Sequence, residues 1–314
     1  LITSAGMQIL ISSFYENFLK KNYLQESEAL GFSKLQLLAD QDLFIEYYKF
    51  STLANAECEL TFVKIRSFLL NSFSEKDTSP LNSEMSIRLL EVISQQAHLL
   101  EYIWDIPEDD KINIKKLKSY IGGLLKDNKS LDVGALMLLA TYEKVSDNAE
   151  FAKLLENYYD LLESSYSFFY DNQFKEETEL YELKKEIKSV TDIKEKTSKA
   201  VASFYESSPY PRWTANLSLQ TKSILELPLD KLISYKIDSS LEINTPSDRT
   251  NILIAGCGTG EGVFNMAHVI KDSHVIGLDL SLSSLSYALK RSASVALNNI
   301  ELLHGDILEV DRLK

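Results

Sequence analysis

A loop of alternating glycines, Gly256-Cys257-Gly258-Thr259-Gly260, carries the clearest chemical signal in this sequence. Glycine lacks a Cβ atom, so its backbone can approach a bound ligand where any other residue would obstruct the contact. An apolar run at 251–255 precedes the loop, and a helix-period segment at 261–271 follows it. This order places the loop between a strand and a helix N-terminus, where nucleotide-like ligands bind in doubly wound folds.

An acidic residue, Asp279, ends the next apolar run, at 274–278. It follows Gly256 at close to the spacing of about 20 residues expected for a carboxylate that accepts hydrogen bonds from ribose hydroxyls. The glycine loop and the carboxylate are independent features of the sequence. Together they predict a site for a ligand that contains a nucleoside.

Glu261 separates two classes of ligand that such a loop can bind. In the dinucleotide pattern Gly-x-Gly-x-x-Gly, the third glycine would fall at position 261. A glutamate there is expected to crowd the helix–strand contact and to repel a pyrophosphate at the helix N-terminus. S-adenosylmethionine has no phosphate and carries a sulfonium and an ammonium group. The sequence therefore favours S-adenosylmethionine, with an NAD-type dinucleotide as the alternative.

Three segments resemble the class I methyltransferase family. Residues 252–260 look like its first motif, whose backbone holds the methionine part of the donor. Residues 275–281 look like the second motif, with Asp279 on the ribose. Residues 303–307 look like the third, with Asp306 on the adenine amino group, and the alternative for Asp306 is a helix cap before Leu308. The resemblance implies a set of cofactor-binding residues: Ala255, Gly256, Cys257, Gly258, Thr259, Gly260, Asp279, Leu280, Asp306 and Ile307.

The sequence departs from the family pattern at one position. The family often has an acidic residue two positions before the first glycine, where this chain has Ile254. Any contact that this acid makes to the donor must therefore come from another residue.

The upstream segment 204–213, which contains Tyr-Pro-Arg-Trp, looks like a signature of bacterial methyltransferases with a helical N-terminal region. That group is similar to the protein-lysine methyltransferases that act on outer-membrane proteins and to methyltransferases fused to helical repeats. The resemblance implies methyl transfer to a protein side chain such as lysine. Tyr210, Arg212 and Trp213 are candidates for closing over donor or substrate, and the alternative is a packed linker with Trp213 buried.

The catalytic residues are not identifiable from the sequence. The donor's sulfonium is already an activated leaving group, so the protein mainly aligns a nucleophile and removes water. Cys257 is expected to be a small filler, although a helix N-terminus would lower its pKa. A class I sheet has seven strands, and the sequence ends at Lys314 after the third. We therefore expect a truncated domain, inactive alone, with catalytic residues beyond Lys314.

Alternating strand and helix patterns must position the loop. Apolar runs at 251–255, 274–278 and 299–303 alternate with helical patterns at 261–271 and 283–297. This alternation predicts a right-handed α/β unit, the N-terminal half of a doubly wound Rossmann-like domain. The first run is rich in β-branched residues, which favours a strand buried on both faces of a parallel sheet.

The first two-thirds of the chain consists of helix-period segments. We expect a helical domain at 1–200, as a bundle or helical repeats, a proline-containing linker at 201–250, and a partial S-adenosylmethionine-binding domain at 251–314. In segment 59–70 all but one or two of the apolar positions from Leu60 onward fall on one face of a helix, with Arg66 on the polar side. The aromatic-rich segment 157–170 is expected to pack rather than to form a ligand cage, and the charge-rich segment 175–199 to form a solvated helix face.

Composition limits the partners. The 46 acidic and 33 basic residues give a net charge of −13, which opposes binding to nucleic acid. We expect a protein substrate, with a small molecule as the alternative, and leave the oligomeric state open. Two cysteines without metal-ligand spacing predict no metal site and a cytoplasmic setting. No run approaches the about 20 apolar residues of a membrane span. A noncatalytic helical interaction protein with a vestigial half-domain is the remaining alternative.

Overall fold

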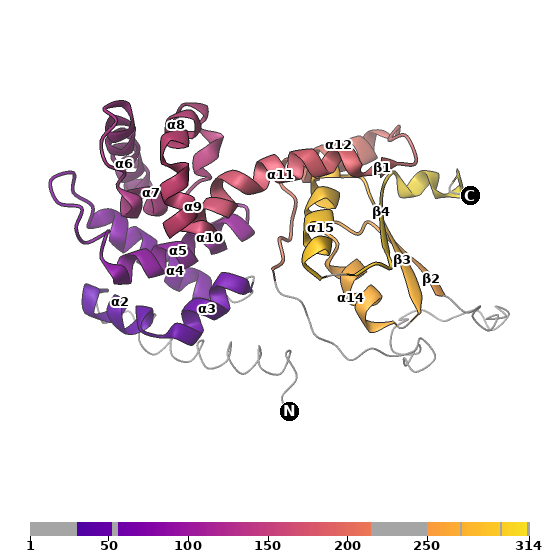
Figure 1. The fold of residues 1–314 in the computed structure, drawn as a ribbon, viewed down its shortest axis with the longest axis horizontal. Coiled ribbons are helices and arrows are strands. Elements are labelled where there is room, and N and C mark those ends of the chain that lie inside the picture. Colours follow the sequence, from indigo (N-terminus) through magenta and orange to yellow (C-terminus); the bar gives the residue numbers. More distant parts are fainter. Residues whose placement is uncertain (1–29, 52–55, 215–249, 271, 296, 313–314) are drawn as a thin grey trace. The chain divides into compact units, whose positions relative to one another are not determined.

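The computed structural model describes residues 30–51, 56–214, 250–270, 272–295 and 297–312 (Figure 1). These residues form two compact units. The helical unit contains residues 30–178 and 212–214, and the sheet unit contains residues 179–211 and 250–312, with the gaps given above. No helix within these ranges is both long and apolar enough to cross a membrane.

The unit boundaries differ from the expected division at residue 200, because residues 179–200 belong to the sheet unit. The expected linker at 201–250 begins inside a helix of that unit, and its part at 215–249 lies outside the described residues. The chain passes from the sheet unit to the helical unit between Pro211 and Arg212.

Short helices connected by tight turns build the helical unit. In chain order they are α2 (Phe32–Ala39), α3 (Asp42–Phe50), α4 (Ala56–Asn71), α5 (Glu84–Leu99), α6 (Glu108–Lys126), α7 (Val133–Leu139), η1 (Val145–Asp147), α8 (Ala149–Leu155), η2 (Glu156–Tyr158), α9 (Tyr159–Ser165), α10 (Ser167–Tyr170), η3 (Asp171–Lys175) and the start of α11 (Glu176–Leu183). Helices α5 and α7 pack together at the centre, where nearly all their side chains are buried. Ser83 and Asp132 cap the two helices by accepting hydrogen bonds from backbone N–H groups.

The predicted apolar face of α4 is confirmed, with one exposed exception. Phe62, Ile65 and Leu69 are buried, whereas Leu60 is exposed. The expectation that Arg66 lies on the polar side is wrong, because its side chain is only 1% exposed. Its guanidinium donates hydrogen bonds of 2.7 Å to the carbonyl oxygens of Thr141 and Asp105 and lies over aromatic rings. Buried charge is tolerated where such hydrogen bonds replace water.

The aromatic-rich segment packs on itself, as predicted. The ring of Tyr159 lies with its centroid 5.2 Å from that of Tyr170 and 5.3 Å from that of Phe174. Phe169 is buried beside Phe174, with 6.3 Å between ring centroids. These edge-to-face and tilted contacts are the arrangements that aromatic side chains favour in protein cores.

Parallel strands and the helices between them build the sheet unit. After the end of α11, its elements are η4 (Lys184–Glu186), β1 (Lys188–Ser189), α12 (Lys196–Ser207), β2 (Thr250–Ala255), α14 (Glu261–Val269), β3 (Ser273–Asp279), α15 (Leu282–Val295), β4 (Ile300–His304) and η6 (Ile307–Arg312). The strands form one parallel sheet in the order β1-β4-β3-β2. The predicted strand–helix alternation is confirmed, and α14 and α15 lie on the same side of the sheet in Figure 1.

The register aligns the carboxyl ends of the central strands. Ala255 at the end of β2 pairs with Leu278 of β3, which in turn pairs with Leu303 of β4. The expectation that the first strand is buried on both faces is wrong, because Leu253 is 47% exposed and Asn251 is also exposed. On β2, partly buried and exposed positions alternate, as expected when helices cover one face of a strand.

The edge strand β1 was not predicted. Ser189 pairs with His304, and the hydroxyl of Ser189 lies 2.8 Å from Nδ1 of that histidine. Two residues later, the hydroxyl of Thr191 accepts a hydrogen bond of 2.7 Å from the backbone N–H of Asp306. The segment that continues α11 therefore covers the edge of β4 (Figure 1).

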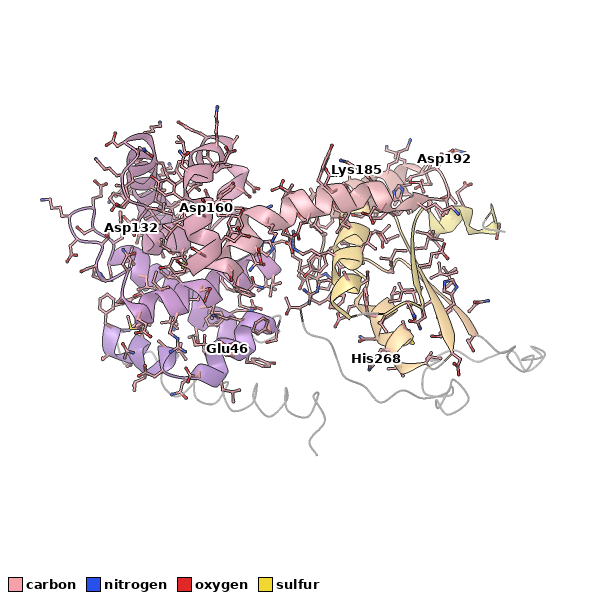
Figure 2. All side chains as sticks on the ribbon, in the orientation of Figure 1. Glu46, Asp132, Asp160, Lys185, Asp192 and His268 are labelled. Atoms are coloured by element: carbon pink, nitrogen blue, oxygen red, sulfur yellow. The ribbon has the colours of Figure 1, made fainter. Side chains whose placement is uncertain are left out.

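The charge-rich segment 175–199 is not one continuous helix face. It comprises the last residue of η3, then α11, η4, β1 and the start of α12. Many of its charged side chains are exposed, as predicted, including Lys185 and Asp192 (Figure 2). Among the described residues, the segment contacts the sheet through the backbone pairing of β1 with β4 and through the Thr191 hydroxyl, and not through its charged side chains.

Candidate functional site

The glycine loop connects β2 to α14 in a conformation that requires glycine. Gly256, Gly258 and Gly260 have φ angles of 69°, 55° and 88°, a region that residues with a Cβ rarely adopt. The backbone N–H groups of Gly256 and Cys257 donate hydrogen bonds of 2.8 and 3.1 Å to the carbonyl oxygen of Leu278. The loop is thus held at the carboxyl end of β3.

The three glycines serve two purposes. A Cβ added at Gly256 or Gly258 would meet no atom within 4 Å, and both residues line an open cavity. A Cβ at Gly260 would lie 2.7 Å from the Cβ of Ala288 and 2.9 Å from the ring of Phe264. Gly256 and Gly258 therefore present backbone to the cavity, whereas Gly260 allows the loop to pack closely against the helices.

The expectation that a side chain at position 261 crowds the helix–strand contact is wrong. Glu261 is exposed and lines the cavity. The close approach falls instead on Gly260 and on Gly277 of β3, where a Cβ would lie 2.9 Å from Val263. The electrostatic part of the argument against pyrophosphate is unaffected, because the carboxylate remains at the helix N-terminus.

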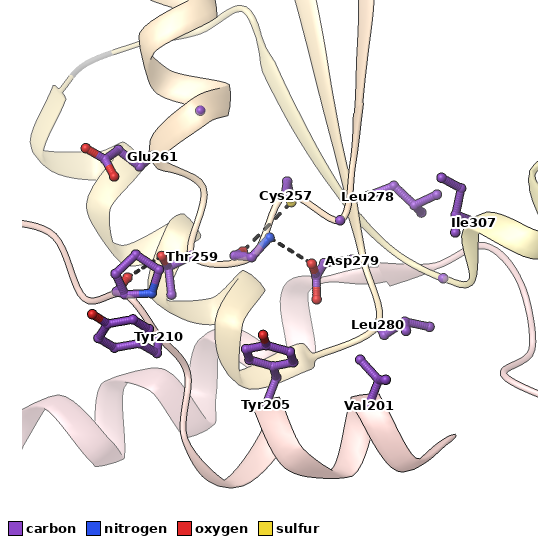
Figure 3. A pocket seen from close by; sticks show the side chains of 15 residues that line it. Val201, Tyr205, Tyr210, Cys257, Thr259, Glu261, Leu278, Asp279, Leu280 and Ile307 are labelled. Carbon is purple, nitrogen blue, oxygen red and sulfur yellow. Dashed lines mark hydrogen bonds between the residues drawn. The ribbon is translucent and has the colours of Figure 1, made fainter. Parts of the chain in front are cut away.

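Asp279 connects the loop to the end of β3. Its carboxylate accepts a hydrogen bond of 2.7 Å from the backbone N–H group of Gly258 (Figure 3) and one of 2.9 Å from that of Ser281. Each carboxylate oxygen has two lone pairs, so the group can still accept hydrogen bonds from a ligand. The same residue therefore orders the loop and faces the cavity.

The cavity has a volume of about 380 Å³, within the range of small-molecule sites. It is lined by Val201, Tyr205, Tyr210, Pro211, Gly256, Cys257, Gly258, Thr259, Glu261, Gly262, Leu278, Asp279, Leu280, Gly305 and Ile307. The set includes eight of the predicted residues: Tyr210, Gly256, Cys257, Gly258, Thr259, Asp279, Leu280 and Ile307. The cavity lies at the carboxyl ends of the strands, where ligands bind in open parallel sheets.

Two aromatic side chains at the cavity come from upstream of the sheet. Tyr205 belongs to α12, and Tyr210 lies in the segment that follows it (Figure 3). The hydroxyl of Thr259 donates a hydrogen bond to the carbonyl oxygen of Pro211, which holds this segment against the glycine loop. Val201 and Tyr205 were missed from the sequence, although their four-residue spacing places both on one face of a helix.

Glu206 fixes α12 against α15. Its carboxylate accepts hydrogen bonds from the backbone N–H of Ser283, at 2.9 Å, and from the hydroxyl of Ser281, at 3.1 Å. It also forms an ion pair of 2.6 Å with Lys184. Partial burial raises the pKa of Glu206, but the hydrogen bonds from Lys184 and Ser283 outweigh burial and lower that pKa below its ordinary value.

Five predicted site residues are not among those that line the cavity: the cofactor-binding candidates Ala255, Gly260 and Asp306, and the lid candidates Arg212 and Trp213. Ala255 is exposed, and Gly260 is buried in the packing described above. Asp306 is 1% exposed, and its carboxylate accepts a hydrogen bond of 3.0 Å from the backbone N–H of Leu308. Asp306 thus caps the helical turn η6 at the end of β4.

Arg212 and Trp213 belong to the helical unit, where both are buried. The guanidinium of Arg212 is ion-paired with Glu101, at 2.5 Å, and with Glu176. Glu176 also lies 2.8 Å from Nε2 of His98, and burial, followed by the charge of Arg212, lowers the pKa of that histidine. These contacts occupy Arg212 within a buried ionic cluster of the helical unit.

The expectation that a helix N-terminus lowers the pKa of Cys257 is wrong. Burial, followed by the nearby charge of Asp279, raises the pKa of the thiol to about 12. The thiol is therefore protonated near neutral pH, which agrees with a filler rather than a nucleophile. In the parts of the chain that the structure describes, no group of three or more His, Cys, Asp or Glu side chains is placed to hold a metal ion.

Comparisons with known proteins agree with this geometry. Residues 246–313 match a family model described as a methyltransferase domain. The chain is similar to the demethylmenaquinone methyltransferase of Listeria monocytogenes serotype 4a (strain HCC23), with 30% identity over 88 residues, 26% of this chain and 37% of the relative. The corresponding protein of Oceanobacillus iheyensis is 31% identical over 78 residues, 24% of this chain and 32% of its own length.

A tRNA (guanine-N(7)-)-methyltransferase of Rubrobacter xylanophilus is 34% identical over 58 residues, 18% of this chain and 26% of the relative. The chain spans about a third of the length of these curated relatives. No solved structure matches the chain. The relatives differ in the molecule they methylate, so the comparisons support methyl transfer as the reaction class and leave the acceptor to other observations.

Proposed function

We propose that this chain binds S-adenosylmethionine and takes part in methyl transfer. The observation that carries the proposal is the glycine loop at the end of β2, where Gly256 and Gly258 leave open space at the cavity and Asp279 lies beside them. The methyltransferase-domain match covers this loop and supports the same reaction. The donor supplies an activated methyl group, so the protein's task is to bind, align and exclude water.

The lining residues fit the parts of such a donor. Asp279 would accept hydrogen bonds from the ribose hydroxyls, and the backbone of Gly256 and Gly258 would lie along the methionine part. Leu280 and Ile307 offer apolar surface for the adenine ring. A contact between Asp306 and the adenine amino group stays a prediction from the family resemblance, because the carboxylate is buried at the start of η6.

Titration calorimetry with this chain tests the donor. We expect heat of binding with S-adenosylmethionine and none with NAD, since the carboxylate of Glu261 stands where a pyrophosphate would sit. Replacing Asp279 by asparagine should weaken S-adenosylmethionine binding. Heat with NAD alone would establish the dinucleotide alternative, and no heat with either ligand would favour a noncatalytic interaction protein.

We further propose that the acceptor is a protein side chain such as lysine and that the protein works in the cytoplasm. The net charge of −13 favours a basic protein partner and opposes nucleic acid, and both cysteines are free thiols. Tyr205 and Tyr210 supply aromatic surface at the cavity, which would exclude water and contact the stem of a lysine. A lysine acceptor must lose its proton before it attacks the methyl group, since only the neutral amine is a nucleophile.

Labelled methyl groups identify the acceptor class. The protein is incubated with labelled donor and, in separate reactions, with cell-extract protein, tRNA and quinone precursors. We expect label in protein, released as methyl-lysine after acid hydrolysis. Label in tRNA or in the quinone fraction would contradict the protein acceptor and would leave the donor assignment intact.

A further inference from the structure

Glu261 occupies a distinct place in the cavity. It is the first residue of α14, it is exposed, and it lines the cavity directly after the glycine loop. In Figure 3, Glu261 and Tyr210 lie toward one end of the lining, Ile307 toward the other, and Asp279 between them. If the ribose lies at Asp279 and the methionine part along Gly256 and Gly258, the methionine end reaches toward Glu261.

Two carboxylates line the cavity, those of Asp279 and Glu261, and they differ in their hydrogen-bond partners. Asp279 accepts hydrogen bonds from two backbone N–H groups of the sheet unit. The carboxylate of Glu261 has no ion-pair or hydrogen-bond partner among the residues that the structure describes. Glu261 is therefore the lining carboxylate that is free to bind a cationic group of a ligand.

The position where related domains often carry an acid cannot supply this charge. Ile254 is partly buried and packs with the apolar cluster of Val263, Ala267 and Val275. An S-adenosylmethionine molecule in this cavity would have an ammonium group at its methionine end. Transfer of a cation out of water costs free energy unless the protein supplies a new partner for it. Glu261, at the start of the neighbouring helix α14, can supply the negative charge that β2 lacks at position 254.

We propose that Glu261 binds the α-ammonium group of S-adenosylmethionine, in place of an acid at position 254. This inference rests on the proposed donor. A purely structural role for Glu261 is to stabilise α14, since a negative charge is favourable at a helix N-terminus. Such a role affects the stability of the helix but does not distinguish one ligand from another, so ligand analogues separate the two roles.

The test compares three ligands by titration calorimetry on the wild-type chain and on Glu261→Gln. S-adenosylmethionine and S-adenosylhomocysteine both carry the α-ammonium group, and S-adenosylhomocysteine lacks the sulfonium charge. 5′-Methylthioadenosine lacks both charges, so the first two ligands together isolate the ammonium group. We expect Glu261→Gln to weaken the first two by about tenfold, the scale of one charge-assisted hydrogen bond in a partly exposed site. Binding of 5′-methylthioadenosine should change by less than about twofold.

Glu186→Gln is the matched control, because Glu186 is an exposed glutamate of the same unit that does not line the cavity. It should leave all three affinities unchanged. Equal weakening of all three ligands by Glu261→Gln would indicate a structural role and overturn the inference, as would an unchanged or tighter affinity for S-adenosylmethionine. A wild-type chain that binds none of the three would overturn the proposed donor itself.

Discussion

Single residues at the glycine loop have separate tasks that substitutions can distinguish. Gly256 and Gly258 leave space for a ligand, whereas Gly260 meets the side chains of Ala288 and Phe264. A left-handed backbone conformation and a close contact coincide at Gly260, so this residue should tolerate a side chain least. Gly262, the second residue of α14, has neither a left-handed backbone conformation nor a close contact.

We expect Gly260→Ala to lower the free energy of unfolding of the sheet unit by about 3 kcal/mol, through backbone strain and overpacking. Denaturant titration measures the change. Gly262→Ala is the control and should be neutral or slightly stabilising, because alanine favours helix. Equal losses in the two variants would contradict the assignment of the close contact to Gly260.

Cys257 should be unreactive in the folded chain. Its thiol pKa is raised to about 12 from an ordinary value of 9.0, so at pH 8 the thiolate fraction is far smaller than in an unfolded chain. Alkylation by iodoacetamide, followed by peptide mass spectrometry, should be at least about a hundredfold slower in the native than in the denatured protein. Rapid modification at neutral pH would show that the thiol is not buried as described.

At the scale of elements, hydrogen bonds between Glu206 and the start of α15 hold α12 where it lines the cavity. Glu206 accepts the N–H of Ser283 in the first turn of α15 and pairs with Lys184. Tyr205 and Val201 line the cavity from the same helix. Weakening this fastening should therefore affect both the stability of the sheet unit and ligand binding.

We expect Glu206→Ala to destabilise the sheet unit by about 1 kcal/mol, the usual value of a helix cap, with the ion pair screened by solvent. The folded-state pKa of Glu206 lies below its ordinary value of 4.5, so its contribution is present above that pH. The difference between wild type and variant should shrink as pH falls below about 4.5. A difference independent of pH down to 3 would contradict the role of the carboxylate.

At the scale of the whole molecule, each unit has its own apolar core, and the helical unit also contains a buried ionic cluster. Arg212, which follows the cavity residue Pro211 in the chain, is buried in the helical unit with Glu101, Glu176 and His98. Removing one partner of a buried ionic cluster leaves the others without compensation, which costs more than losing an exposed ion pair.

Arg212→Ala should destabilise the helical unit by about 3–5 kcal/mol. Arg88→Ala is the control, because Arg88 forms an ion pair with the exposed Asp42, and it should cost less than about 1 kcal/mol. Thermal unfolding followed by circular dichroism measures both. Similar small effects in the two variants would show that the Arg212 cluster is not buried in solution.

Acid should also weaken the helical unit through His98. Its folded-state pKa is lowered, chiefly by burial and then by Arg212, so the unfolded chain binds a proton that the folded unit excludes. Stability is therefore complete above the ordinary pKa of 6.5 and declines as pH falls below it. Between pH 7 and 5, His98→Gln should show a smaller decline than wild type, and identical slopes would rule out His98 as the titrating group.

Much of the sheet unit was predictable because its signals are local. Apolar runs, helical periodicity and the glycine loop depend on neighbouring residues along the chain, and β2, β3, β4, α14 and α15 appear where these patterns placed them. Asp279 was predictable for the same reason, since a residue at the end of one strand lies beside the loop that follows its parallel neighbour.

The sequence by itself thus determined the strand–helix alternation, the glycine loop and the position of Asp279. Only the tertiary structure decided which charges are buried, as for Arg66 and Arg212, and that Glu261 lies at the cavity rather than in the helix–strand contact. It also joined β1 and α12 to the sheet unit. The physical reason is that periodicity and glycine geometry act between near neighbours, whereas burial and pKa depend on residues that only packing brings together.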